Sequence, residues 1–130
     1  MIDRIRLTAA AKIQLSTLKR KTGIEHYNSI CRHALCLSLA NPSMPPEEEF
    51  NFNGGVDIDW RTFTGGHEEV YLNLLLLRTR QDHVNTNIDN IKQMCVRHLH
   101  RGLSYLAGKD DGFMVDAALE KLDQGSFSPR

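Results

Sequence analysis

Three cysteines and the histidines near them are the residues of this sequence that could hold a metal ion or carry sulfur. Cys31 and Cys36 are separated by four residues within a helical pattern, and Cys95 shares a helical face with His98. A structural zinc site takes four closely spaced ligands, and an iron–sulfur cluster normally takes four cysteines. The sequence offers neither set, so we expect no cofactor and reduced, buried thiols. A reactive thiol at Cys31 or Cys36 that relays a persulfide, or a scaffold role, is the alternative.

A group of cations in the first third of the chain is suited to phosphate. Four of them lie within one predicted helix and its last turn: Lys12, Lys19, Arg20 and Lys21. Lysine is a flexible point charge that pairs with phosphate oxygens and carries little information about base sequence. Gly23 and Ile24 are predicted to open the next helix, whose free amides could also meet a phosphate. These residues favour contact with a nucleic-acid backbone; a solvated helix face whose cations suit the helix dipole is the alternative.

Residues that could catalyse a reaction do not match a known template. The sequence has no Gly-rich phosphate loop, no G-x-S-x-G and no H-E-x-x-H. The run Glu47–Glu49 is predicted to be solvated, and Asp57 and Asp59 alternate with apolar residues, as the outer face of an extended segment does. We therefore expect that the chain is not an enzyme.

The elements that must position these residues are mostly helical. A short strand is predicted over residues 2–7, and Thr8 is predicted to cap the first helix. Helices are predicted over residues 9–21, 24–40, 67–81, 85–107 and 112–122. Residues 50–60 (FNFN-GG-VDIDW) give a weak hairpin signal, and a loop that packs its aromatic side chains onto the helices is equally compatible. The fold class we expect is mainly α, opened by one short strand.

The strand–helix–helix order of residues 2–40 is the layout of ribbon-helix-helix proteins, in which two chains pair their strands into a ribbon that enters the DNA major groove. Alternation predicts that Arg4 and Arg6 point outward with Thr8, while Ile5 and Leu7 point into the dimer. A sequence-specific repressor that reads bases with the two arginines is therefore a second interpretation.

The charges of the chain come in blocks, although 16 basic and 16 acidic residues give a formal net charge of zero. Residues 1–42 carry seven Lys or Arg against two Asp or Glu, and residues 43–70 carry one against seven. A charged partner responds to such a block rather than to the sum. We expect one domain with four parts: a basic strand–helix–helix unit (1–42), an acidic connector (43–66), a helical pair (67–109) and an acidic tail (110–130).

The predicted helix over residues 67–81 is apolar nearly all round, which a surface helix of a small protein is not. We expect its leucines to be buried between subunits of a homo-oligomer, with a tetramer built as a dimer of dimers. These leucines are Leu72, Leu74, Leu75, Leu76 and Leu77.

Targeting signals are not visible in the sequence. The first residues have no apolar core of a signal peptide, and the longest apolar run, residues 74–77, is far shorter than the roughly 20 residues that a membrane span needs. We expect a cytoplasmic protein without a membrane partner.

Two stretches carry a family resemblance. The segment LTAAAKIQLSTLKRKTGIEHYNSICRHALCLSLANPS and the later WRTFTGGHEEVYLNLLLLR resemble the DndE family of small bacterial DNA sulfur modification proteins, over roughly residues 4–80. The resemblance implies participation in phosphorothioation, which replaces a non-bridging phosphate oxygen of DNA by sulfur. It implies as partners double-stranded DNA, a cysteine desulfurase, the adenylating protein DndC and the ATPase DndD. The family member is regarded as the DNA-binding component, and a preference for nicked or distorted duplex is compatible with chemistry at the backbone.

Overall fold

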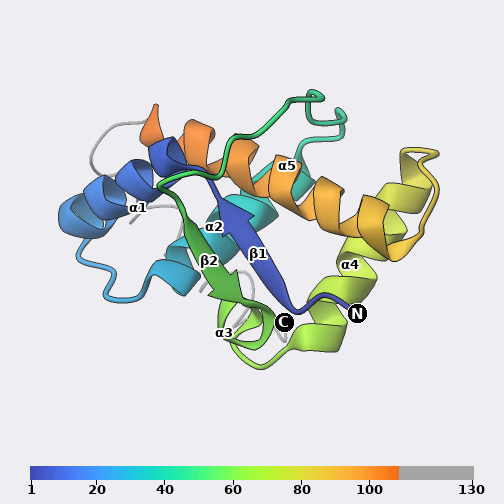
Figure 1. The fold of residues 1–130 in the computed structure, drawn as a ribbon, viewed down its shortest axis with the longest axis horizontal. Coiled ribbons are helices and arrows are strands. Elements are labelled where there is room, and N and C mark those ends of the chain that lie inside the picture. Colours follow the sequence, from blue (N-terminus) through green and yellow to red (C-terminus); the bar gives the residue numbers. More distant parts are fainter. Residues whose placement is uncertain (109–130) are drawn as a thin grey trace, which may run out of the picture.

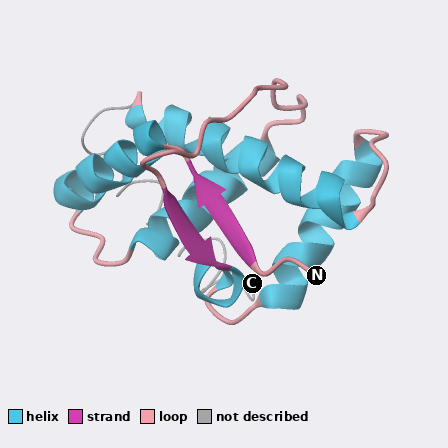
Figure 2. Cartoon of the chain, viewed as in Figure 1, coloured by secondary structure: helices cyan, strands magenta, loops and turns pink. Residues whose placement is uncertain are grey.

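Residues 1–108 are described in a computed structural model of the chain (Figure 1). The elements are β1 (Arg4–Leu7), α1 (Ala9–Thr22), α2 (Tyr27–Ala40), β2 (Val56–Asp59), α3 (Trp60–Thr64), α4 (Glu68–Gln81) and α5 (Ile88–Ala107). Helices dominate this part of the chain, so the expected mainly α class is confirmed (Figure 2). Nowhere in residues 1–108 is a helix long and apolar enough to cross a membrane. The helix predicted over residues 112–122 and the acidic tail lie outside the described residues.

The N-terminal strand has its partner in the same chain. β1 pairs antiparallel with β2, and the register places Ile5 opposite Ile58 and Arg6 opposite Asp57. Ile5 is fully buried and Arg6 is exposed, as the alternation predicts. The sequence did not show that β2 is the partner of β1, and within residues 1–108 β2 does not form the suggested local hairpin with residues 50–53. Opposite charges on the outer face and apolar side chains on the inner face suit this pairing.

The first helix has the predicted cap and a sharply defined end. Thr8 Oγ1 accepts the Ala11 N–H at 3.1 Å, which satisfies one of the free donors at the start of α1. α1 ends at Gly23, whose φ of 73° lies in the left-handed region that glycine adopts without strain. Three residues then pass before α2 begins at Tyr27, so the predicted start at Ile24 is wrong by three residues.

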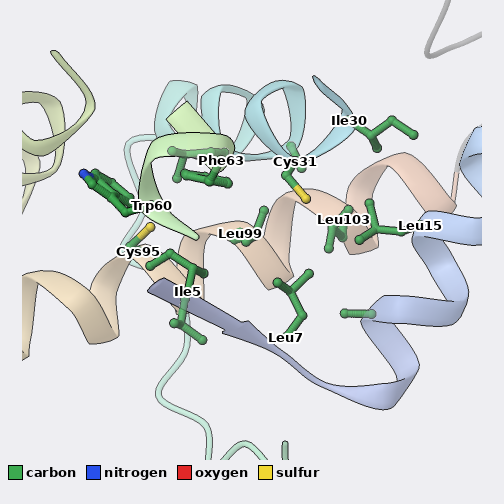
Figure 3. Packing of buried hydrophobic residues seen from close by; sticks show 14 of the residues in the cluster. Ile5, Leu7, Leu15, Ile30, Cys31, Trp60, Phe63, Cys95, Leu99 and Leu103 are labelled. Carbon is green, nitrogen blue, oxygen red and sulfur yellow. The ribbon is translucent and has the colours of Figure 1, made fainter. Parts of the chain in front are cut away.

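The core lies between β1, the short helix α3 and the crossing of α2 with α5 (Figure 3). Gly102 of α5 makes the close crossing possible, because a Cβ there would lie 1.8 Å from the carbonyl oxygen of Ala34 in α2. In α3, Trp60 and Phe63 stack with ring centroids 5.5 Å apart, and both are buried. The largest fully buried side chains are Trp60, Phe63, Ile5, Leu7, Leu15, Ile30, Leu35, Leu75, Met94, Leu99, Leu103 and His98.

The leucine-rich helix α4 divides its apolar residues between this core and the surface. Leu75 is buried within the chain, and Leu72 and Leu76 pack partly against the core. The prediction that all five leucines face another subunit is therefore wrong for Leu75, which the chain itself covers. Leu74 and Leu77 remain exposed at 43% and 53% of their surface.

Candidate nucleic-acid interface

The cations of α1 lie on the side of the helix away from the core. Ala11, Leu15 and Leu18 face inward, whereas Lys12, Lys19, Arg20 and Lys21 are exposed. Lys12 and Lys19 are seven positions apart, which places them on one flank with about 10 Å of helix rise between them. Arg20 lies at the centre of the exposed side, and Lys21 lies on the opposite flank. The four predicted residues thus form a broad surface, which we call the α1 surface, rather than a single row.

Lys19 is positioned by the start of the next helix. Its Nζ lies 4.9 Å from the ring centroid of Tyr27, the first residue of α2. The Tyr27 hydroxyl lies 3.2 Å from Ser16 Oγ, so the ring is tied to the middle of α1. The sequence did not indicate that Tyr27 contacts this surface. The geometry of the turn between α1 and α2 determines which residue of α2 lies against α1.

The amides of the interhelical turn are already used by the chain. The Gly23 N–H donates to the Lys19 carbonyl at 3.0 Å, and the Ile24 N–H donates to Thr22 Oγ1 at 3.2 Å. The prediction that Gly23 and Ile24 offer free amides at a helix start is therefore wrong. Gly23 ends α1 and so fixes where its last cations stand.

Arg4 and Arg6 are exposed on β1 but lie beside a carboxylate. Arg6 Nε lies 3.2 Å from Asp57 Oδ1, and Arg4 Nε lies 3.8 Å from Asp57 Oδ2. The Arg6 guanidinium also lies 5.1 Å from the ring centroid of Phe52. Asp57 therefore offsets part of the charge of both arginines. The acidic spacing of β2 was visible in the sequence, but its pairing with β1 was not.

Three arginines of α4 and α5 bind the last turn of α2 and the connector that follows it. Arg78 donates to the carbonyl oxygens of Leu39, Asn41 and Ser43 at 2.8–2.9 Å. Arg101 donates to the Ser38 and Ser43 carbonyls, each 2.8–2.9 Å away. Arg97 donates to the carbonyls of Pro45 and Pro46. Because these guanidinium groups bind backbone carbonyls, we assign them to the stability of the fold rather than to DNA contact.

The cysteines fall into two environments. Cys31 and Cys95 are buried in the core, and burial raises the pKa of both thiols, that of Cys31 to about 12 (Figure 3). A thiol with a raised pKa stays protonated at neutral pH and is a poor nucleophile, so a persulfide relay through Cys31 is not supported. Cys36 is only partly buried. Among the described residues, no three His, Cys, Asp or Glu side chains are grouped so that they could hold a metal ion.

Fold and surface together define a small, mainly helical protein whose first helix carries cations toward solvent. The model of one family, the DNA sulphur modification protein DndE, matches residues 4–112. The chain therefore belongs to the DndE family and has a role in DNA sulfur modification. The resemblance carried by residues 4–80 is confirmed and extends beyond the leucine-rich helix. No individual curated protein matches the chain.

Proposed function

We propose that the chain is the DNA-binding, non-catalytic subunit of its sulfur modification system and holds the duplex by its phosphate backbone. The observation that carries the proposal is the α1 surface, where Lys12, Lys19, Arg20 and Lys21 project from one rigid helix. Within residues 1–108, no carboxylate lies within ion-pair distance of Lys12 or Arg20. Cations without a carboxylate partner displace counterions from DNA when they bind its phosphates.

The kind of recognition follows from the residue types. Lysine contacts to phosphates position a protein on a duplex but do not read bases. We infer that binding has little sequence preference, with nicked or distorted duplexes accepted at least as well as intact ones. Arg4 and Arg6 have a weaker role in this proposal, because Asp57 offsets part of their charge.

Assembly would multiply the α1 surface. Val70, Leu74 and Leu77 recur at helical spacing on α4 and are each at least 43% exposed. We propose that a second copy of this chain covers this stripe, which we call the α4 stripe, in a homo-oligomer such as a tetramer. The further partners that we propose are the other proteins of the modification system, among them DndC and DndD.

A DNA titration with matched variants tests the proposal. We expect Lys12→Gln combined with Lys19→Gln to weaken binding to unrelated duplexes equally and to lower the salt slope by about 2. The matched control is Lys92→Gln, which removes a cation on α5 that pairs with Asp3 and should leave binding nearly unchanged. Affinity is measured between about 50 and 200 mM salt, on intact and nicked duplexes.

Two outcomes would contradict the proposal. Undiminished binding by the double variant would move the DNA contact away from α1. A large preference for one duplex sequence that Arg4→Ala or Arg6→Ala relaxes would favour the repressor interpretation instead.

A further inference from the structure

A small cavity between α2 and α4 brings together side chains that the DNA proposal does not use. Its volume is about 220 Å³, and its lining residues are Ser29, Arg32, His33, Cys36 and Tyr71. Cys36 is half-buried and lines this cavity, whereas Cys31 and Cys95 are buried. We call this space the Cys36 cavity.

The guanidinium in the cavity is fixed in place. Arg32 Nη1 donates to the carbonyl oxygen of Phe63 at 2.9 Å, and Nη2 donates to Ser29 Oγ at 3.2 Å. Gly65 leaves room for it, because a Cβ at that position would lie 3.1 Å from Nη1. Arg32 precedes Cys36 by four residues on α2, so the two side chains share a face of the helix. A cation held beside a thiol favours the thiolate, which is the reactive form.

Tyr71 of α4 closes the group from the other side. Burial raises the pKa of the Tyr71 hydroxyl, the nearby Cys36 raises it further, and Arg32 lowers it. Tyr71, Cys36 and Arg32 also line the same cavity. Nucleophile, cation and hydrogen-bond donor meet in one cavity, which is an arrangement suited to covalent chemistry on sulfur.

We propose that the Cys36 cavity is a sulfur-acceptor site, at which Cys36 receives a sulfane sulfur from a persulfide. The Cys36 thiolate attacks the outer sulfur of a donor R–S–SH, the donor S–S bond breaks, and R–S⁻ leaves. The product is Cys36–S–SH, so one S–S bond is exchanged for another and the persulfide proton is retained. Arg32 and the Tyr71 hydroxyl stabilise the charged sulfur. Membership of a DNA sulfur modification family makes persulfides the donor class to test.

Sulfur transfer to the purified chain gives a direct test. One arm uses glutathione persulfide, and a second uses a cysteine desulfurase with cysteine, which presents a protein-bound persulfide. Trypsin cleaves after Arg32, so Cys31 and Cys36 fall on different peptides and mass spectrometry assigns the added sulfur. We expect sulfur on Cys36 from at least one donor, with Cys31 and Cys95 as unmodified internal references.

Variants of the cavity residues test whether the cavity promotes the transfer or whether Cys36 reacts only because donors can reach it. Cys36→Ser should abolish the transfer. Arg32→Gln should slow it about tenfold, because without the Arg32 charge a smaller fraction of Cys36 is in the thiolate form. The matched control Arg80→Gln should leave the rate unchanged, because Arg80 is exposed and does not line the cavity. Since Arg32 also binds Phe63, Tyr71→Phe is the second variant, and we expect it to slow the transfer while the fold is retained.

The proposal is overturned if neither donor modifies Cys36, or if Arg32→Gln and Tyr71→Phe both transfer sulfur at the wild-type rate. It is independent of the DNA proposal, because Cys36→Ser should bind duplex DNA as the wild type does. Loss of sulfur transfer with intact DNA binding would therefore leave the proposed function standing.

Discussion

His98 is a titratable side chain that the folded chain encloses completely. Its Nδ1 lies 2.9 Å from Ser38 Oγ, which also accepts Arg101 Nε–H at 2.8 Å. Burial lowers the pKa of His98 to about 3, and Arg78, Arg101 and Arg97 act in the same direction. The imidazole is therefore neutral in the folded protein at neutral pH.

This neutrality predicts a loss of stability in mild acid. The ordinary pKa of 6.5 describes the unfolded chain, so that state binds a proton first as the pH falls, and the free energy of unfolding decreases between about pH 6.5 and about pH 3. Above about pH 7, His98 contributes no pH dependence. Its slope approaches about 1.4 kcal/mol per pH unit within the window.

Urea unfolding at about pH 7.5 and about pH 5 measures the effect. His98→Asn keeps a polar atom near Ser38 and should flatten the dependence, whereas His26→Gln, at an exposed position, should leave it unchanged. An equal pH dependence in the wild type and His98→Asn would show that other groups cause it.

At the scale of elements, the connector between α2 and β2 is held by α4 and α5. Arg78 is the central residue, because its side chain is only 9% exposed and pairs with Asp82 at 3.1 Å while donating to three carbonyl groups. Removing Arg78 would leave the Asp82 carboxylate and three carbonyl groups without the partner that offsets the cost of burying them. The connector thus depends on a residue far away in the sequence.

Arg78→Met should therefore lower the free energy of unfolding by about 3–5 kcal/mol. Hydrogen exchange should rise at the backbone amides of Asn41, Ser43 and Met44 if the variant remains folded. Arg80→Met, on the exposed side of the same helix, is the matched control and should change stability by less than about 0.5 kcal/mol. A similar loss in both variants would mean that α4 itself, rather than the Arg78 contacts, had been weakened.

The elements also show which features the sequence predicts. The alternation of β1, the Thr8 cap and the apolar stripe of α1 are local patterns, and the structure confirms them. The pairing of Asp57 with Arg6 and the binding of Arg101 to the connector join segments more than 50 residues apart. No local periodicity encodes such contacts, so the sequence does not show that Arg97 and Arg101 bind the connector. For the same reason, Tyr71 joins the Cys36 cavity only when α4 packs near α2, whereas the other lining residues share α2 with Cys36.

For the whole molecule, the α4 stripe provides the test of assembly. Leu74→Glu with Leu77→Glu should shift the mass in sedimentation toward the monomer while leaving the circular dichroism spectrum unchanged, because both side chains are exposed. DNA affinity should fall with it, since assembly repeats the α1 surface. Leu75→Ala is the contrasting variant and should instead cost about 2–5 kcal/mol of stability, because Leu75 lies in the core. A double variant that keeps the wild-type mass would place any interface elsewhere.

The pairing of β1 with β2 also governs how the chain can fold as it is made. Residues 1–42 contain the α1 surface, but Ile5 and Leu7 are covered only when β2, α3 and α5 have been synthesised. The first strand must wait for a partner some 50 residues further along, and closing so long a loop is entropically costly until the core forms with it. The basic unit is therefore not a portable module. Grafted alone onto another protein, it would transfer the charges without the geometry that arranges them.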